Sequence, residues 1–157
     1  MADDVIAFIE ALGLRHPVLY GFSDGGILCL LVALKRPELP ERLIISGANL
    51  DPRGVKRSLT AMLRVATFFN KDPKLMLMLR EPRIPPASLK AVTMPVLVLA
   101  GSRDLIREEH TRLIAASLPR ATLKLLPGES HGSYIVHSEK IARLILEETG
   151  RTAEVTA

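Results

Sequence analysis

The chain has 157 residues, a length that suits a single folded domain over 1–157. Hydrophobic residues make up 48% and charged residues 24%, a balance that excludes intrinsic disorder of the whole chain. The single cysteine, Cys29, excludes an internal disulfide and a cysteine-based zinc site. The acidic start and the lack of a long apolar run favour a cytoplasmic protein with no membrane partner.

The net charge of +4 is concentrated in one segment. Residues 51–90 contain nine Lys or Arg and three Asp or Glu, a net of +6, so the rest of the chain is slightly acidic. Because stacking aromatic residues do not accompany this charge, no nucleic-acid partner is expected. A solvated charged face is the favoured interpretation, and attraction of an anionic substrate is the alternative.

Apolar residues recur with the spacing of helices and of short buried strands. In chain order the sequence predicts a helix over 4–13, a strand over 18–20, a helix over 27–35, a strand over 42–46, an amphipathic helix within 55–66, a strand over 96–99, a helix over 108–118, a strand over 121–126 and a helix over 141–146. This alternation predicts an α/β fold with a mostly parallel sheet of about four strands flanked by helices.

Residues 51–90 interrupt the alternation and predict a short helical insert within the domain. Three of the five methionines and two of the four phenylalanines lie there. These side chains would either line a substrate pocket or pack the insert on the body, and the sequence leaves both open.

Three of the four predicted strands are followed at once by a residue that can take part in catalysis. These residues are Ser23, Asp104 and His131. Ligands of parallel sheets bind beyond the carboxyl ends of the strands, so the three side chains are expected to meet there.

The segment Gly21–Gly25 matches the pattern G-x-S-x-G between a strand and a helix. Small flanking residues allow a strained turn that exposes the serine hydroxyl, and the helix N-terminus favours a developing oxyanion. A serine needs a base, and an acid must orient that base. We therefore predict Ser23 as nucleophile, His131 as base and Asp104 as acid, with Glu129 as a weaker rival for the acid.

These residues, in the order Ser, Asp, His, resemble the α/β-hydrolase superfamily in its esterase and lipase-like branch, over its C-terminal half. The matching stretches are 18–26, 94–104 and 125–132. The resemblance implies a catalytic triad of Ser23, Asp104 and His131, with the backbone N–H of Asp24 as an oxyanion donor. It implies a helical cap over the substrate pocket at 51–90, hydrolysis of a small carboxylic ester through an acyl-enzyme, and no cofactor or metal. Cleavage of an amide, a lactone or a carbon–carbon bond is also open on this fold.

The family pattern places four strands and a second oxyanion donor before the serine turn, whereas here Ser23 follows the first predicted strand. The strand Val18–Tyr20 is then expected at a sheet edge, where a homodimer or a chain supplying the missing strands would pair with it. The alternative function is a non-catalytic half-hydrolase that acts as a binding or interaction module.

Other polar candidates receive structural interpretations. The Asp24 side chain is expected to serve the helix dipole or a cap. His16 and His110 are expected on the surface or in loops, and Cys29 as a packed, inert thiol.

Overall fold

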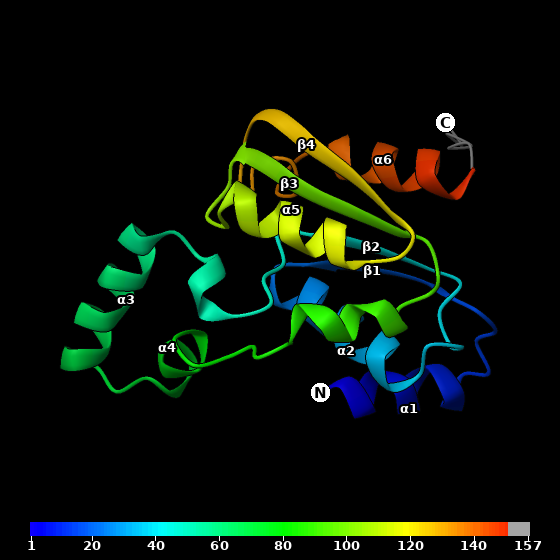
Figure 1. Ribbon diagram of the computed structural model, residues 1–157, viewed down its shortest axis with the longest axis horizontal. Helices are drawn as coiled ribbons and strands as arrows, with labels where there is room; N and C mark the ends of the chain where they lie inside the picture. Colours follow the sequence, from blue (N-terminus) through cyan, green and yellow to red (C-terminus); the bar gives the residue numbers. More distant parts are fainter. Residues whose placement is uncertain (151–157) are drawn as a thin grey trace.

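The computed structural model describes residues 1–150, without the Lys74 side chain. Its elements in chain order are α1 (Ala2–Ala11), β1 (Val18–Phe22), α2 (Asp24–Lys35), β2 (Arg42–Ser46), the 3₁₀ turn η1 (Pro52–Gly54), α3 (Arg57–Phe69), α4 (Pro73–Met78), the 3₁₀ helix η2 (Pro86–Ala91), β3 (Val96–Arg103), α5 (Glu108–Ser117), β4 (Ala121–Ser130) and α6 (Lys140–Thr149). The predicted α/β class is confirmed (Figure 1).

The four strands form one parallel sheet in the order β1-β2-β3-β4. Leu43 of β2 is paired with Leu19 of β1 and with Val96 of β3, so β2 and β3 occupy the centre. Within the described residues β1 pairs only with β2, which places it at an edge of the sheet. Parallel pairing aligns the carboxyl ends of all four strands at one side.

Both faces of the sheet are covered, because successive side chains of a strand point to opposite faces. Leu43 and Ile45 pack toward α2 and α5, whereas Ile44 and Leu97 pack toward α6. Figure 1 shows α6 and α5 on either side of the strands. Full burial of such a side chain contributes about 1.5–3 kcal/mol, so the central strands are the most firmly held part of the molecule.

The segment 51–90 leaves the sheet between β2 and β3 and carries α3 and α4 away from the body (Figure 1). Leu63 is the buried residue of α3, and Phe68 and Phe69 are each 81% exposed. The end of the segment returns to the body, where Ile84 and Leu89 pack in the main core. The part that projects is therefore shorter than the predicted insert.

None of the helices within 1–150 is long and apolar enough to cross a membrane.

Candidate active site

The structure brings Ser23, Asp104 and His131 together at the carboxyl end of the sheet. Ser23 directly follows β1, Asp104 directly follows β3, and His131 directly follows β4. β3 and β4 are longer than the ranges 96–99 and 121–126 predicted from their apolar residues, and β4 extends as far as Ser130. The strand ends thus position the three side chains.

Ser23 occupies a strained turn between β1 and α2. Its φ of 53° and ψ of −117° are rare for a residue with a side chain. The Ser23 amide donates to the carbonyl of Ser46, 2.8 Å away, which holds the turn against β2. A Cβ at Gly21 would lie 2.1 Å from the carbonyl oxygen of Gly25, so only glycine permits this close approach.

Asp24 is the first residue of α2, and Ser23 is its N-cap. The carbonyl of Ser23 accepts from the amides of Gly26 and Ile27, which starts the helix. An amide in the first helical position has no acceptor within its own helix, and the helix dipole adds positive potential there. The Asp24 N–H is thus suited to bind an oxyanion. The Asp24 side chain forms no cap hydrogen bond on α2, but as an acidic group in the first turn it matches the dipole as expected.

His131 connects the other two side chains. Its Nδ1 lies 2.7 Å from Oδ1 of Asp104, and its Nε2 lies 3.2 Å from Oγ of Ser23. Because an ionised carboxylate only accepts, Nδ1–H donates to Asp104 and Nε2 is left to accept from the serine hydroxyl. The Phe22 ring packs against the imidazole with centroids 4.8 Å apart. Gly47, at φ +58°, makes room on another side, since a Cβ there would lie 2.8 Å from Cε1 of His131.

Asp104 is only 2% exposed, yet it has several donors. Oδ1 also accepts from the Ile106 amide at 2.9 Å, and Oδ2 accepts from the Gly101 amide at 3.3 Å. Burial is the largest influence on this carboxyl and acts to raise its pKa. The hydrogen bonds from His131 and the two amides together outweigh it, so the pKa of Asp104 falls below its ordinary value. The carboxylate is therefore ionised when it meets the imidazole.

A buried contact between Tyr134 and Ser46 stabilises the backbone around the site. The hydroxyl of Tyr134 lies 2.6 Å from Oγ of Ser46, and Tyr134 is fully buried. Burial raises the pKa of Tyr134 to about 12, so the phenol stays protonated. The contact ties the loop after His131 to β2, whose Ser46 carbonyl holds Ser23. Sequence patterns alone do not predict this pair, and the position of Tyr134 three residues after His131 is the one local signal for it.

The remaining candidates separate into different roles. Glu129 pairs with Lys140 and accepts from Ser133, so its carboxylate is engaged away from the imidazole. Cys29 is buried as expected, and burial raises the pKa of its thiol to about 11. His16 is exposed as expected.

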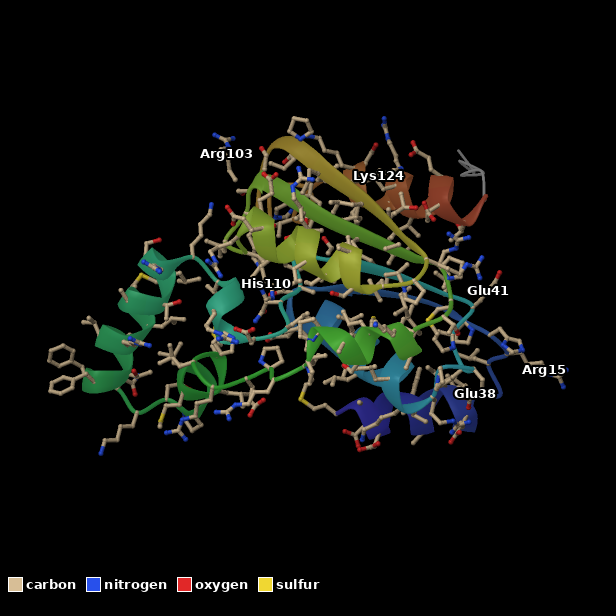
Figure 2. All side chains as sticks on the ribbon, in the orientation of Figure 1. Arg15, Glu38, Glu41, Arg103, His110 and Lys124 are labelled. Carbon is tan, nitrogen blue, oxygen red and sulfur yellow. The ribbon has the colours of Figure 1, made fainter. Side chains whose placement is uncertain are left out.

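The expectation for His110 was wrong. His110 is buried on the inner face of α5 beside η1, and its Nε2 accepts from the Leu50 amide at 2.9 Å (Figure 2). Burial lowers the pKa of this imidazole, and the acceptor role requires the neutral ring. The helical spacing that buries Ile114 also turns His110 inward, so His110 is a structural histidine.

No three His, Cys, Asp or Glu side chains of residues 1–150 gather as ligands of a metal ion would.

Comparisons with known proteins find similarity to hydrolases. No family model matches the chain. The serine hydrolase BPHL of Mus musculus is 22% identical over 169 residues, which cover 92% of this chain and 58% of that protein. A 2-hydroxymuconate semialdehyde hydrolase of Pseudomonas putida is 26% identical over 184 residues, covering 91% of this chain and 66% of the relative. The chain thus spans somewhat more than half to about two thirds of the length of these relatives.

The solved structures agree with the relatives on the fold. A hydrolase from Oleispira antarctica has a TM-score of 0.78 with 15% identity, over 96% of this chain and 71% of that one. An α/β hydrolase from a lagoon sediment metagenome, MGS-MChE2, has a TM-score of 0.73 with 22% identity, over 95% of this chain and 68% of that one. These likenesses agree in fold with the parallel sheet and with the serine turn that follows its edge strand β1. The chain is therefore a protein of the α/β-hydrolase fold that resembles the α/β-hydrolase superfamily and spans only part of the length of its relatives.

Proposed function

We propose that this chain carries the nucleophile, base and acid of a serine hydrolase that acts on a small carboxylic ester. The observation that carries the proposal is the continuous hydrogen-bonded series from Asp104 through His131 to Ser23. Such a series activates a hydroxyl that is otherwise a weak nucleophile.

The reaction follows from the donor and acceptor roles in the series. His131 Nε2 takes the proton of Ser23 as Oγ attacks the ester carbonyl, and Asp104 stabilises the imidazolium that forms. The imidazolium then gives its proton to the leaving alcohol, and an acyl-enzyme remains on Ser23. Water, activated by the same imidazole, releases the acid and restores the hydroxyl.

The oxyanion of the tetrahedral intermediate needs donors of its own. The Asp24 N–H at the start of α2 is the donor that we assign. Loss of one oxyanion donor costs on the order of 100- to 1,000-fold in rate, so a single donor predicts slow turnover. The segment 51–90 is proposed as the cap over the substrate, and its exposed apolar side chains suit an apolar acyl or alcohol group.

The names of the relatives support hydrolysis more strongly than they support an ester. The mouse relative is named a serine hydrolase, and the Pseudomonas putida relative is named for 2-hydroxymuconate semialdehyde. Because one fold hosts many substrates, the ester rests on the general chemistry of an activated serine.

The test is labelling with a fluorophosphonate probe, which reacts with activated serines. We expect the probe to label the wild-type chain and the exposed-site control Ser58→Ala equally, and to leave Ser23→Ala unlabelled. Hydrolysis of a nitrophenyl ester by the wild type should fall by about 1,000-fold or more in Ser23→Ala. An unlabelled Ser23 in folded wild-type protein would overturn the proposal. Labelling without turnover would mean an activated nucleophile with an insufficient oxyanion site.

The edge of β1 that is unpaired among the described residues favours one alternative function, a module that binds another chain. The Ser23 amide bonds to β2, so by the alternation of a parallel strand the backbone groups of Val18, Tyr20 and Phe22 face away from β2. We propose that a second copy, or a chain supplying further strands, pairs with these groups. Light scattering at high micromolar concentration tests the homodimer, and a monomer there would contradict it.

A further inference from the structure

A large cavity outside the triad carries an unusual concentration of positive charge. It has a volume of about 1110 Å³ and lies between the segment 51–90 and the start of α5. Six arginines line it: Arg53, Arg57, Arg64, Arg80, Arg83 and Arg107. Asp51 is the one acidic residue on this lining, while Ser23, Asp104 and His131 are not part of it.

The charges of the cavity are not balanced by the protein. Asp51 already accepts from the backbone amide and Nε of Arg53. In the part of the chain that the structure describes, the side chains of Arg57, Arg64 and Arg80 have no ion pair. Among the described residues, Arg36 and Arg42 of the body each have an acidic partner, whereas these three arginines of the cavity have none.

Arg107 adds an independent observation. Its Nε is buried, and no acceptor for it exists among the described residues. Its backbone amide donates to the carbonyl of Gly54, which fixes the residue between α5 and η1. A buried donor without an acceptor is costly, so a small turn of the Arg107 guanidinium toward the cavity, where a ligand oxygen would accept from Nε, removes that cost.

The arrangement favours a ligand with more than one negative oxygen group. Guanidinium groups bind carboxylate and phosphate oxygens in pairs, and several of them around one cavity repel each other unless an anion lies between them. Apolar walls from Val55, Leu79 and Ile84 lower the local dielectric and strengthen the attraction. We propose that this cavity binds a small multivalent oxyanion, the phosphate part of a phosphate ester or a polycarboxylate.

The cavity lies near the triad without being part of it. Arg107 follows Asp104 by three residues, and Asp51 follows Gly47, which abuts His131, by four. The reach of an extended chain limits these separations to about 11 Å and about 14 Å. The proposal therefore goes beyond the hydrolase reaction and can be tested by binding alone, whatever the fate of Ser23.

The test is calorimetric titration of the full chain with sodium pyrophosphate and, separately, with sodium citrate at low ionic strength. We expect saturable binding to one site that weakens as salt is added, because the attraction is electrostatic. Tighter binding of pyrophosphate assigns a phosphate-bearing ligand, and tighter binding of citrate assigns a polycarboxylate.

Matched variants locate the site. Arg57→Gln with Arg64→Gln should weaken binding by about tenfold or more, since each removes a charge-assisted hydrogen bond. Arg80→Gln, on a different element, should weaken it by a smaller factor. The control Arg15→Gln with Arg120→Gln removes the same charge from surface positions outside the cavity lining, and should change affinity less than twofold. Figure 2 shows Arg15 at the opposite end of the molecule from α3.

A site-specific signal completes the design. The Nε–H resonance of Arg107 should shift as pyrophosphate or citrate is added. The proposal is overturned if neither anion binds at low salt, or if the surface control loses as much affinity as the cavity variant. It is also overturned if all variants bind like the wild type while the Arg107 signal stays unchanged.

Discussion

The sheet and the projecting part of the segment 51–90 are built on opposite physical principles. Leu43 and Leu97 in the sheet are completely buried, whereas Phe68 on α3 is 81% exposed. The sheet gains its rigidity from apolar contacts on two faces, and the ends of its strands hold Ser23, Asp104 and His131 within hydrogen-bond distance of one another. α3 has a single buried residue. The difference separates a rigid body that positions side chains from a projecting segment that buries little apolar surface.

Charge follows the same division. On the body, Lys35 pairs with Asp3, Arg36 pairs with Glu10, and Arg42 pairs with Glu148. At the cavity beside the segment 51–90, six arginines gather around a single acidic residue, Asp51, which pairs with Arg53, and among the described residues Arg57, Arg64 and Arg80 have no ion pair. Paired charges mostly keep a surface soluble, whereas unpaired charges of one sign attract ligands.

The largest effect should come from removing buried apolar volume. Leu43→Ala is expected to lower the free energy of unfolding by about 2–5 kcal/mol, because it opens a cavity between α2 and the sheet. Phe68→Ala should change the free energy of unfolding by less than about 0.5 kcal/mol, since the ring is already exposed. Urea denaturation followed by circular dichroism measures both. Equal losses would mean that α3 is as tightly packed as the sheet.

The serine turn should tolerate a methyl group at one glycine and not at the other. Gly21→Ala places a Cβ against the Gly25 carbonyl and should cost about 3 kcal/mol, because backbone must move. A Cβ at Gly25 meets nothing within 4 Å, so Gly25→Ala should leave stability unchanged or raise it by up to about 1 kcal/mol. Thermal unfolding of the two variants provides the comparison. A stable Gly21→Ala variant would contradict the close approach at the turn.

Removing a buried hydroxyl in the body should lower the free energy of unfolding more than removing an exposed hydroxyl on α3. Tyr134→Phe removes the buried bond to Ser46 and should cost about 1–2 kcal/mol, because the Ser46 hydroxyl loses a partner. Thr67→Val removes an exposed bond from Oγ to the Arg64 carbonyl and should cost less than about 0.5 kcal/mol. The denaturant midpoints of Tyr134→Phe and Thr67→Val measure this difference in stability, and esterase rates would show whether Tyr134 also positions the Ser23 turn. Equal midpoint shifts in both variants would contradict the expected difference.

The smallest effect concerns acid pH. The pKa of Asp104 is lower in the folded chain than in the unfolded chain, so its ionised form contributes stability above the unfolded pKa near 4. That contribution is lost as pH falls through the folded pKa. The stability gap between wild type and Asp104→Asn should therefore narrow below about pH 4 in thermal melts. A gap that stays constant down to pH 3 would contradict the lowered pKa.

The sequence by itself determined the body. Alternating apolar runs and helix-length connections specify a parallel sheet, because burial on two faces leaves few other arrangements. The G-x-S-x-G turn and the strand ends are enough to predict that Ser23, Asp104 and His131 meet. These predictions rested on local periodicity and on the rule that parallel strands end at one side.

Only the tertiary structure decided which distant side chains meet. The Tyr134 hydroxyl reaches Ser46 across 88 positions, and His110 turns inward to accept from Leu50 across 60. Arg57 and Arg64 lie on α3, Arg80 lies in the loop before η2, and Arg107 is the N-cap of α5; they share one cavity only because these three parts of the chain converge. Local spacing in the sequence does not predict such convergence. The positive charge of residues 51–90, for which the sequence favoured a solvated face, therefore becomes a candidate binding site in the fold.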